Sequence, residues 1–239
     1  MVSPQQADTR NRLLRIMSRD AFAILAPHLE YSELPLKHVL VEADVANTHV
    51  FFMEGGLASV IALSADDEAV EVGHVGREGL AGQHVLLMTE QTPTRTFMQV
   101  AGSAYAVPVE AFLEIVSADP AFQRLMFRYV HSCGIQLAHS ALANARYNVY
   151  ERLARWLLMC HDRLGDELPL THEFLSIMLG VRRSGVTDQL HLLEGTHAIR
   201  SRRGHITVRD RSKLEEIASG CYGVPEREYT RLTGTTIRA

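Results

Sequence analysis

The pattern of apolar and polar positions divides the chain into a strand-rich first half and a helical second half. In the first half, short alternating runs separated by turn residues predict strands. They cover residues 39–42, 49–54, 57–63, 70–75, 96–100 and 104–108. Two short helices, over 11–17 and 20–29, are predicted ahead of them. Many short strands at this spacing favour a small β-barrel or sandwich.

A long helix is predicted from Asp119-Pro120 to about residue 145, because aspartate caps a helix and proline suits its first turn. Its apolar residues recur in steps of four, three, four and four. They are Met126, Val130, Cys133, Leu137 and Ala141. This spacing is close to a coiled-coil seam and predicts a dimerisation helix. The alternative is a helix that packs only against its own barrel.

The stretch from Leu170 to Val208 predicts two helices joined by a tight turn. Thr171 can cap the first helix, which carries one apolar stripe. The stripe consists of Phe174, Leu175, Met178 and Leu179. Gly180 then breaks the pattern, as a turn with positive φ requires. The second helix opens with Arg182 and Arg183, and a helix of this width fits the major groove of DNA.

A basic hairpin is predicted directly after this helix pair. Residues 199–208 alternate around Arg203-Gly204, which is typical of two short strands with arginines near the tip. Such a hairpin can reach DNA phosphates. A helix pair with a solvated arginine face is the alternative, but the adjoining hairpin favours DNA binding. The predicted DNA contacts are Thr171, His172, Arg182, Arg183, Ser184, Thr187, Asp188, Arg202 and Arg203.

Charge is distributed unevenly along a chain whose net charge is −4. Residues 147–239 hold 14 basic and 12 acidic residues, whereas residues 1–146 hold 10 and 16. Within residues 182–213 there are 8 basic and 3 acidic residues. The positive charge therefore coincides with the predicted groove-facing elements, as expected of an electrostatic footprint for DNA.

Other classes of function find little support in the sequence. The cysteines Cys133, Cys160 and Cys221 are an odd number at scattered spacings, so neither a disulfide framework nor a zinc site is predicted. The 12 histidines are scattered as well, and no metal site is expected. Paired carboxylates, a nucleophile elbow and a phosphate loop are lacking, so an enzyme is not expected. Without an apolar run of ~20 residues or a signal peptide, we expect a cytoplasmic protein with no membrane partner.

The order of these elements resembles the Crp/Fnr superfamily of bacterial transcription regulators over nearly the whole chain. Gly180-Val181-Arg182-Arg183 matches the superfamily step Gly-x-(Ser/Arg)-Arg that opens the recognition helix. Residues 183–190 match R-x-x-V-(T/G)-R-x-L, except that Asp188 stands where arginine is usual.

The resemblance implies an α+β fold in three parts. Residues 1–118 would form a double-stranded β-helix (jelly-roll) sensor domain of the cyclic-nucleotide-binding type. Residues 119–146 would form the dimerisation helix and hinge. Residues 147–239 would form a winged helix-turn-helix domain. Apart from the resemblance, Gly220, Gly223, Pro225 and many polar residues after Ile217 predict a loose extension. The resemblance also implies a homodimer on double-stranded DNA at a pseudo-palindromic operator, with RNA polymerase as a partner.

Two residues of the recognition helix depart from the superfamily. Gly185 costs about 1 kcal/mol relative to alanine within a helix. Asp188 would repel phosphate or accept a hydrogen bond from a cytosine amino group. We therefore expect an operator that differs from the best-known superfamily site.

The candidate effector site also departs from the superfamily. Nucleotide-binding members place a glutamate on the ribose hydroxyl and, about ten residues on, an arginine on the cyclic phosphate. The corresponding residues here are Gly82, Gln83, His84, Arg95 and Thr96. Because Gln83 replaces the glutamate, a cyclic nucleotide, another anion and no effector all stay open. No cysteine precedes residue 133, which argues against an iron–sulfur cluster. The rival function is a cyclic-nucleotide-binding regulatory module that acts through a protein partner.

Overall fold

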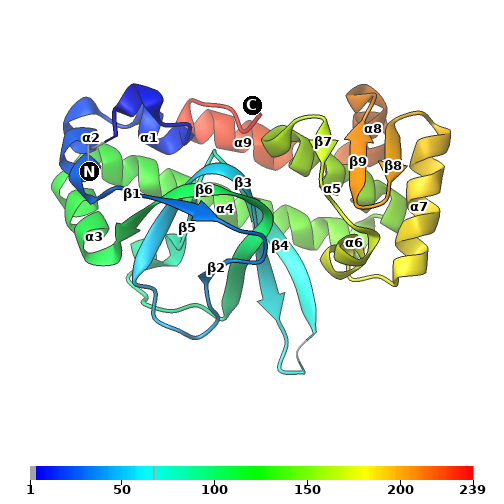
Figure 1. The fold of residues 1–239 in the computed structure, drawn as a ribbon, viewed down its shortest axis with the longest axis horizontal. Helices are drawn as coiled ribbons and strands as arrows, with labels where there is room; N and C mark the ends of the chain where they lie inside the picture. Colours follow the sequence, from blue (N-terminus) through cyan, green and yellow to red (C-terminus); the bar gives the residue numbers. More distant parts are fainter. Residues whose placement is uncertain (1–3, 67, 239) are drawn as a thin grey trace.

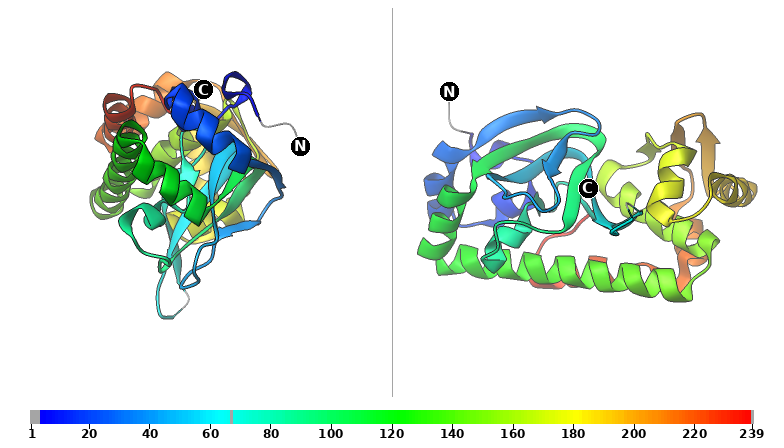
Figure 2. Two further views of the ribbon diagram at one scale, coloured as in Figure 1. Left: turned by 90° about the vertical axis from the view of Figure 1, so that its left-hand side faces the viewer. Right: turned by 90° about the horizontal axis from the view of Figure 1, so that it is seen from below.

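The computed structural model describes residues 4–66 and 68–238. A β-barrel and a helical domain lie side by side, and one long helix, α4 (Pro120–Arg146), runs along both (Figures 1 and 2). The predicted α+β architecture, with a β-rich N-terminal part, a long helix and a C-terminal helix-turn-helix, is confirmed.

The barrel is one sheet with the strand order β1-β6-β3-β4, to which β2 and β5 add at the sides. Its strands are β1 (Glu30–Leu34), β2 (Val39–Val41), β3 (His49–Leu63), β4 (Ala69–Val75), β5 (Leu80–Ala81) and β6 (Thr94–Pro108). The two longest strands, β3 and β6, pair along their whole length.

The predicted strands 49–54 and 57–63 are the single strand β3, and 96–100 with 104–108 belong to the single strand β6. The register shifts between Met53 and Ala58, so these strands bend there instead of ending. Gly56 has φ +76° and lies so close to β6 that a Cβ atom would be 2.6 Å from the carbonyl oxygen of Val100. A turn was expected at Gly55-Gly56, between the two predicted strands; the structure has a bend within β3 there instead.

Short helices close one end of the barrel. They are η1 (Gln6–Asp8), α1 (Arg12–Ile16), α2 (Arg19–Leu25), η2 (Ala26–His28), η3 (Gln83–Leu87) and α3 (Val109–Ala118). Together with α4 they enclose a core that contains Phe52, Phe112 and Phe122. A second apolar cluster, which includes Leu40, Met53 and Met98, fills the barrel interior. Strands β1 and β5 and helix α3 were not predicted, because β1 is mostly exposed and polar and β5 has only two residues.

The C-terminal part contains the helix-turn-helix and a small sheet of order β7-β9-β8. Its elements are α5 (Val149–Leu164), β7 (Glu167–Leu168), α6 (His172–Leu179), α7 (Arg183–Gly195), β8 (Ile199–Arg202), β9 (His205–Val208), α8 (Arg211–Ala218), η4 (Ser219–Cys221) and α9 (Val224–Thr233). The core under α5 to α8 is continuous with Leu57 and Ile61 of the barrel. The two parts therefore share apolar contacts.

The expectation of a loose extension after Ile217 is wrong. Helix α9 packs along α4, and Tyr229 and Ile237 join the apolar core of the N-terminal part. The Tyr229 hydroxyl donates to the carbonyl of Glu78 at 2.6 Å. The chain thus returns from the helix-turn-helix to the barrel, and residues 224–238 pack with the part predicted to end at residue 118. The polar composition of the tail hid this, because only a few apolar residues anchor it.

Candidate nucleic-acid interface

The helix-turn-helix is formed by α6 and α7, as the apolar spacing predicts. The Thr171 side chain accepts a hydrogen bond from the backbone N–H of Phe174 at 3.2 Å and so caps α6. Gly180 follows α6 with φ +61°, the left-handed conformation that the turn requires. Leu175, Met178 and Leu179 of α6 share a core with the inward residues of α7, which are Val186, Leu190 and Leu193.

The outward face of α7 is polar and open to solvent. Arg182, Arg183, Ser184 and Asp188 are exposed, and Thr187 is half-buried. His191 continues this face beyond Asp188, and its side chain is 70% exposed. It was not among the predicted contacts, although its spacing of three from Asp188 places it on the same side of a helix. The face therefore presents two guanidinium groups, a carboxylate and an imidazole.

His172 lies behind this face and joins three elements. Its Nδ1 atom is 3.0 Å from the Thr187 hydroxyl on α7, and its Nε2 atom is 3.4 Å from the Ser201 hydroxyl on β8. Burial lowers the pKa of His172, and the positive charge of Arg183 acts in the same direction. His172 and Thr187 were predicted to contact DNA, but their polar groups face each other. The structure thus gives them a supporting position between helix and hairpin.

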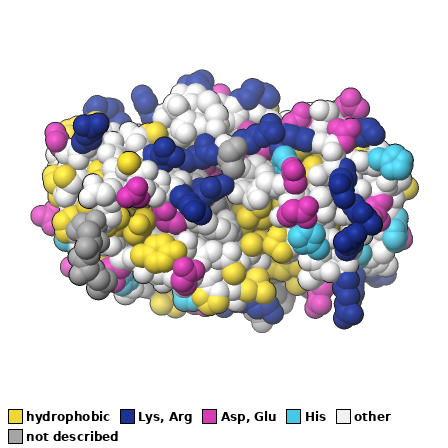
Figure 3. Space-filling view, turned by 45° about the horizontal axis from the view of Figure 1, so that its top comes forward, with side chains coloured by type: hydrophobic (Ala, Val, Ile, Leu, Met, Phe, Trp, Pro, Cys, Tyr) yellow, Lys and Arg dark blue, Asp and Glu magenta, His cyan; other side chains and the backbone are white. Residues whose placement is uncertain are grey.

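Strands β8 and β9 form the predicted basic hairpin. Gly204, at φ +72°, makes its turn, and Arg202 and Arg203 are exposed beside it. The backbone N–H of Ser201 donates to the Glu194 carboxylate at 2.6 Å, which fixes the hairpin against the end of α7. Figure 3 shows Lys and Arg side chains in a band at the end of the molecule that carries this domain. Arg200 and Arg209 are exposed at the hairpin as well, and they were not predicted.

Gly185 allows a direct test of helix propensity. A Cβ atom at Gly185 would have no neighbour within 4 Å, and the residue lies inside α7. We expect Gly185→Ala to raise the free energy of unfolding by about 1 kcal/mol. Gly180→Ala is the matched control: its positive φ should instead lower stability by roughly 1–2 kcal/mol. Calorimetry on both variants measures the difference, and a destabilised Gly185→Ala would contradict it.

The candidate effector residues are not gathered into one site. Gly82 follows β5, where Ala81 pairs with Phe51 of β3, whereas Arg95 pairs with Ile61, ten positions further along β3. Arg95 forms an ion pair with Glu42, with its Nε atom 3.1 Å from the carboxylate. Arg95 also lines a cleft of about 640 Å³ between the barrel and α6, alongside Phe97 and Phe174.

This placement does not fit a cyclic nucleotide bound in the superfamily manner. The phosphate-binding arginine would have to turn towards η3, but Arg95 faces the helical domain. The interior of the barrel next to it is filled by apolar side chains, among them Met53 and Met98. Gln83 and His84 stay on η3 without the expected arginine beside them. The sequence resemblance missed this, because spacing alone does not show which side of β6 a residue faces.

The outer face of α4 exposes apolar side chains. Phe127, Leu137 and Leu142 are 47%, 50% and 43% exposed. Gly134, Ala138 and Ala141 lie between them and are exposed as well. Of the predicted seam, Leu137 and Ala141 belong to this face, and Val130 is half-buried.

Two residues of the predicted seam point elsewhere. Met126 is fully buried in the core beneath α4, and Cys133 packs against the same core. The exposed face lies one residue further round the helix, at Phe127 and Gly134. The helical spacing of three and four residues was predicted correctly. The sequence did not show which of two neighbouring stripes of α4, the one with Met126 or the one with Phe127, the barrel covers.

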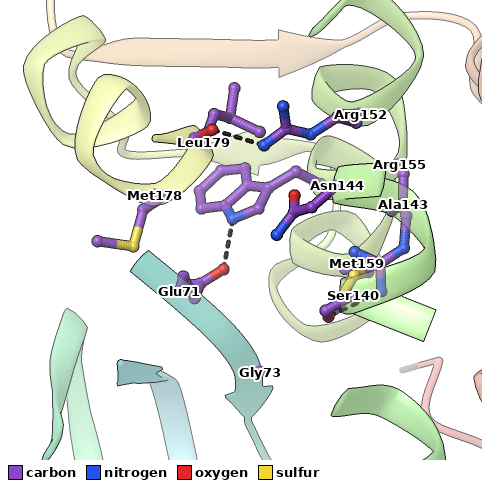
Figure 4. A pocket seen from close by; sticks show the side chains of 11 residues that line it. Glu71, Gly73, Ser140, Ala143, Asn144, Arg152, Arg155, Met159, Met178 and Leu179 are labelled. Atoms are coloured by element: carbon purple, nitrogen blue, oxygen red, sulfur yellow. Dashed lines mark hydrogen bonds between the residues drawn. The ribbon is translucent and has the colours of Figure 1, made fainter. Parts of the chain in front are cut away.

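The helical domain is held against the barrel by polar contacts as well as apolar ones. The Trp156 indole N–H donates to Glu71 on β4 at 2.5 Å (Figure 4). Within the helical domain, Arg152 of α5 donates to the carbonyl of Leu179 at the end of α6, at 2.6 Å. The aromatic rings of Phe97 on β6 and Phe174 on α6 meet edge to face, with centroids 6.2 Å apart. The helix-turn-helix is thus held in place by contacts with the barrel.

Within residues 4–66 and 68–238, no group of three or more His, Cys, Asp or Glu side chains is arranged to hold a metal ion. No helix in the described part of the chain is both long and apolar enough to cross a membrane.

One part of the chain matches a known family model. Residues 151–217 match the family model of the Crp-like helix-turn-helix domain. A search of curated protein sequences found no match.

Solved structures share the fold over most of the chain. FixK2 from Bradyrhizobium japonicum has a TM-score of 0.70 at 15% identity, covering 80% of this chain and 98% of its own. A Crp/Fnr family regulator from Eubacterium rectale has a TM-score of 0.69 at 15% identity, covering 87% and 98%. The c-di-GMP responsive global regulator CLP from Xanthomonas campestris has a TM-score of 0.65 at 14% identity, covering 80% and 99%. The chain therefore carries a Crp-like helix-turn-helix domain within the fold of the Crp/Fnr family of transcription regulators.

Proposed function

We propose that this protein is a sequence-specific transcription regulator that binds DNA through α7 and the β8–β9 hairpin. The observation that carries the proposal is the exposed polar face of α7 with Arg182 and Arg183 at its start. In the described part of the chain neither guanidinium forms an ion pair, so both are available for base edges or phosphates. Arginine is suited to guanine because its forked donors match the acceptors O6 and N7.

Residues at the interface take different roles in this proposal. Arg182, Arg183, Ser184 and Asp188 face the bases from α7. Arg202 and Arg203 hold phosphates from the hairpin, and Thr171 lies at the exposed start of α6. Asp188 selects against a base that offers only acceptors, because a carboxylate needs a donor such as the cytosine amino group.

The proposed active form is a homodimer that pairs through the outer face of α4. The small residues Gly134, Ala138 and Ala141 permit close approach of two helices, and Leu137 and Phe127 supply apolar area to bury. A twofold axis at this face would present two copies of α7 to the half-sites of a pseudo-palindromic operator. RNA polymerase as a partner and a location in the cytoplasm follow from this function and stay predictions.

In this proposal the barrel, residues 4–118, is the sensor domain, and residues 147–218 bind DNA. Residues 219–238 serve as a connection back to the barrel. The rival function, a cyclic-nucleotide module acting through a protein partner, is disfavoured because Arg95 pairs with Glu42 and faces away from η3.

Paired arginine variants test the roles of helix and hairpin. Arg183→Ala is expected to cost ~1–3 kcal/mol in operator affinity and to relax sequence preference. Arg202→Ala should weaken binding to all sequences about equally. Because one phosphate contact is lost, the slope of log affinity against log salt concentration should fall by about 1. Duplexes selected from a random pool supply the operator, and binding is measured at several salt concentrations. Arg231→Ala, which removes an exposed side chain on α9, is the control and should change neither the affinity nor its salt dependence. Equal losses of both variants on selected and random DNA would contradict the assignment.

A further inference from the structure

Arginines gather in a hollow far from the helix-turn-helix, beside α1 and the C-terminal tail. The hollow has a volume of about 330 Å³ and is lined by Arg10, Arg12, Arg15, Arg77, Ile16 and Thr235. Arg10 and Arg15 are exposed, and Arg12 and Arg77 are half-buried. Figure 3 shows dark blue side chains grouped in the middle of the same face. Four positive charges therefore converge on one concave surface.

The two acidic side chains near this hollow, Glu54 and Glu78, are engaged by other groups. The nearby Glu54 carboxylate accepts from the backbone N–H groups of Arg10 and Asn11, at 2.7 and 2.9 Å. The Glu78 carboxylate is held by Arg163, whose Nε atom donates to it at 2.8 Å. Among residues 4–66 and 68–238, none of the four arginines of the hollow forms an ion pair.

The backbone beneath the hollow is rigid. The N–H of Arg12 donates to the carbonyl of Arg77 at 2.8 Å, which joins α1 to the β4–β5 connection. The fully buried Asn11 donates to the carbonyls of Met53 and Gly79 at 3.0 and 2.7 Å, and its oxygen caps α1. Like charges are therefore held near each other by the fold. Burial lowers the pKa of Arg12; Tyr229 and Glu78 oppose this shift, and the positive charges of Arg77 and Arg15 add to it.

We propose that this hollow is a binding site for a compact polyphosphate, such as the phosphate chain of a nucleoside triphosphate. Guanidinium groups bind phosphate oxygens through two parallel hydrogen bonds, and several around one anion relieve their mutual repulsion. The concave shape favours a small anion over a duplex, which needs an extended surface. Ile16, 38% exposed at the wall, offers an apolar contact for the organic part of the ligand.

Titration calorimetry of the full chain with inorganic tripolyphosphate and with adenosine triphosphate, at low salt, tests the site. We expect binding that weakens with salt and that Arg15→Gln and Arg77→Gln each reduce by roughly tenfold, as loss of a charge-assisted hydrogen bond implies. Arg124→Gln, which removes an exposed charge on α4 outside the hollow, is the control and should leave affinity unchanged. Tighter binding of adenosine triphosphate than of tripolyphosphate would indicate that Ile16 contacts the organic part of the ligand. Equal binding would indicate that the phosphate groups alone provide the affinity.

Three outcomes would overturn the proposal. They are no binding of either anion by the wild-type chain, equal losses in Arg124→Gln, and unchanged affinity in both hollow variants with thermal unfolding as in the wild type. A loss of affinity for long DNA in Arg15→Gln, without binding of either small anion, would assign the hollow to the duplex instead. Because operator binding is measured separately with the α7 variants, failure here is distinguishable from failure of the proposed function.

Discussion

Leu137→Asp is expected to yield a monomer that no longer binds its operator tightly. The side chain is half-exposed on the outer face of α4, and a carboxylate there would lie against its own copy across a twofold axis. Burying two unpaired like charges costs more than such an interface gains. Because two linked half-site contacts strengthen binding by roughly 10²–10⁴-fold, operator affinity should fall by a similar factor.

Sedimentation and operator titration on the same sample measure both effects. Ile24→Asp is the matched control, since Ile24 is an apolar residue that is 53% exposed on α2 and not part of the outer face of α4. It should stay dimeric and bind DNA normally. A Leu137→Asp protein that sediments as a dimer would show that the outer face of α4 is not the interface.

Arg163→Ala is expected to destabilise the chain more than any surface substitution. Arg163 and Glu78 form a buried ion pair with side chains 2% and 5% exposed, and the guanidinium also donates to the carbonyl of Met159 at 2.9 Å. Removing one partner leaves the other charge buried and unpaired, which costs about 3–5 kcal/mol. In a chain of this size that corresponds to a fall in Tm of roughly 10 °C.

A double-mutant cycle separates the pair from its surroundings. Glu78→Ala alone should be similarly damaging, since its carboxylate also accepts from the N–H of Gly76. The double variant should lose less than the sum of the two single ones. Arg231→Ala, which breaks the exposed pair with Glu228, should cost under about 1 kcal/mol. Additive single losses would show that Arg163 and Glu78 act independently.

The long helix α4 and the first helix of the helix-turn-helix, α6, could be predicted well, because each begins at a capping residue and carries a periodic apolar face. The helix predicted from Asp119-Pro120 to about residue 145 agrees with α4, and Thr171 and Gly180 mark the limits of α6. The barrel was harder, since Gly55 and Gly56 indicate a change of direction without showing that pairing continues through it.

The candidate site was predicted in part. Exposure of Arg182, Arg183, Ser184, Asp188, Arg202 and Arg203 agrees with the expected groove-facing surface. The inward turn of His172 and Thr187, the outward turn of Arg95, and the burial of Met126 depend on contacts between elements distant in the sequence. No local pattern encodes those contacts. The arginine hollow is of the same kind, because Arg77 joins Arg10, Arg12 and Arg15 only through the fold.

The return of the tail to the barrel changes how the winged domain can move. The domain is attached at both of its ends, through Tyr147 and Asn148 before α5 and through the segment from η4 to α9 after α8. At the far end of this second attachment, Arg12 donates to the Thr236 hydroxyl at 3.0 Å. With two attachments, the domain cannot rotate freely about a single hinge. Any rearrangement that turns α7 towards an operator must therefore be a rotation about the line joining the two attachments, or must first release the tail.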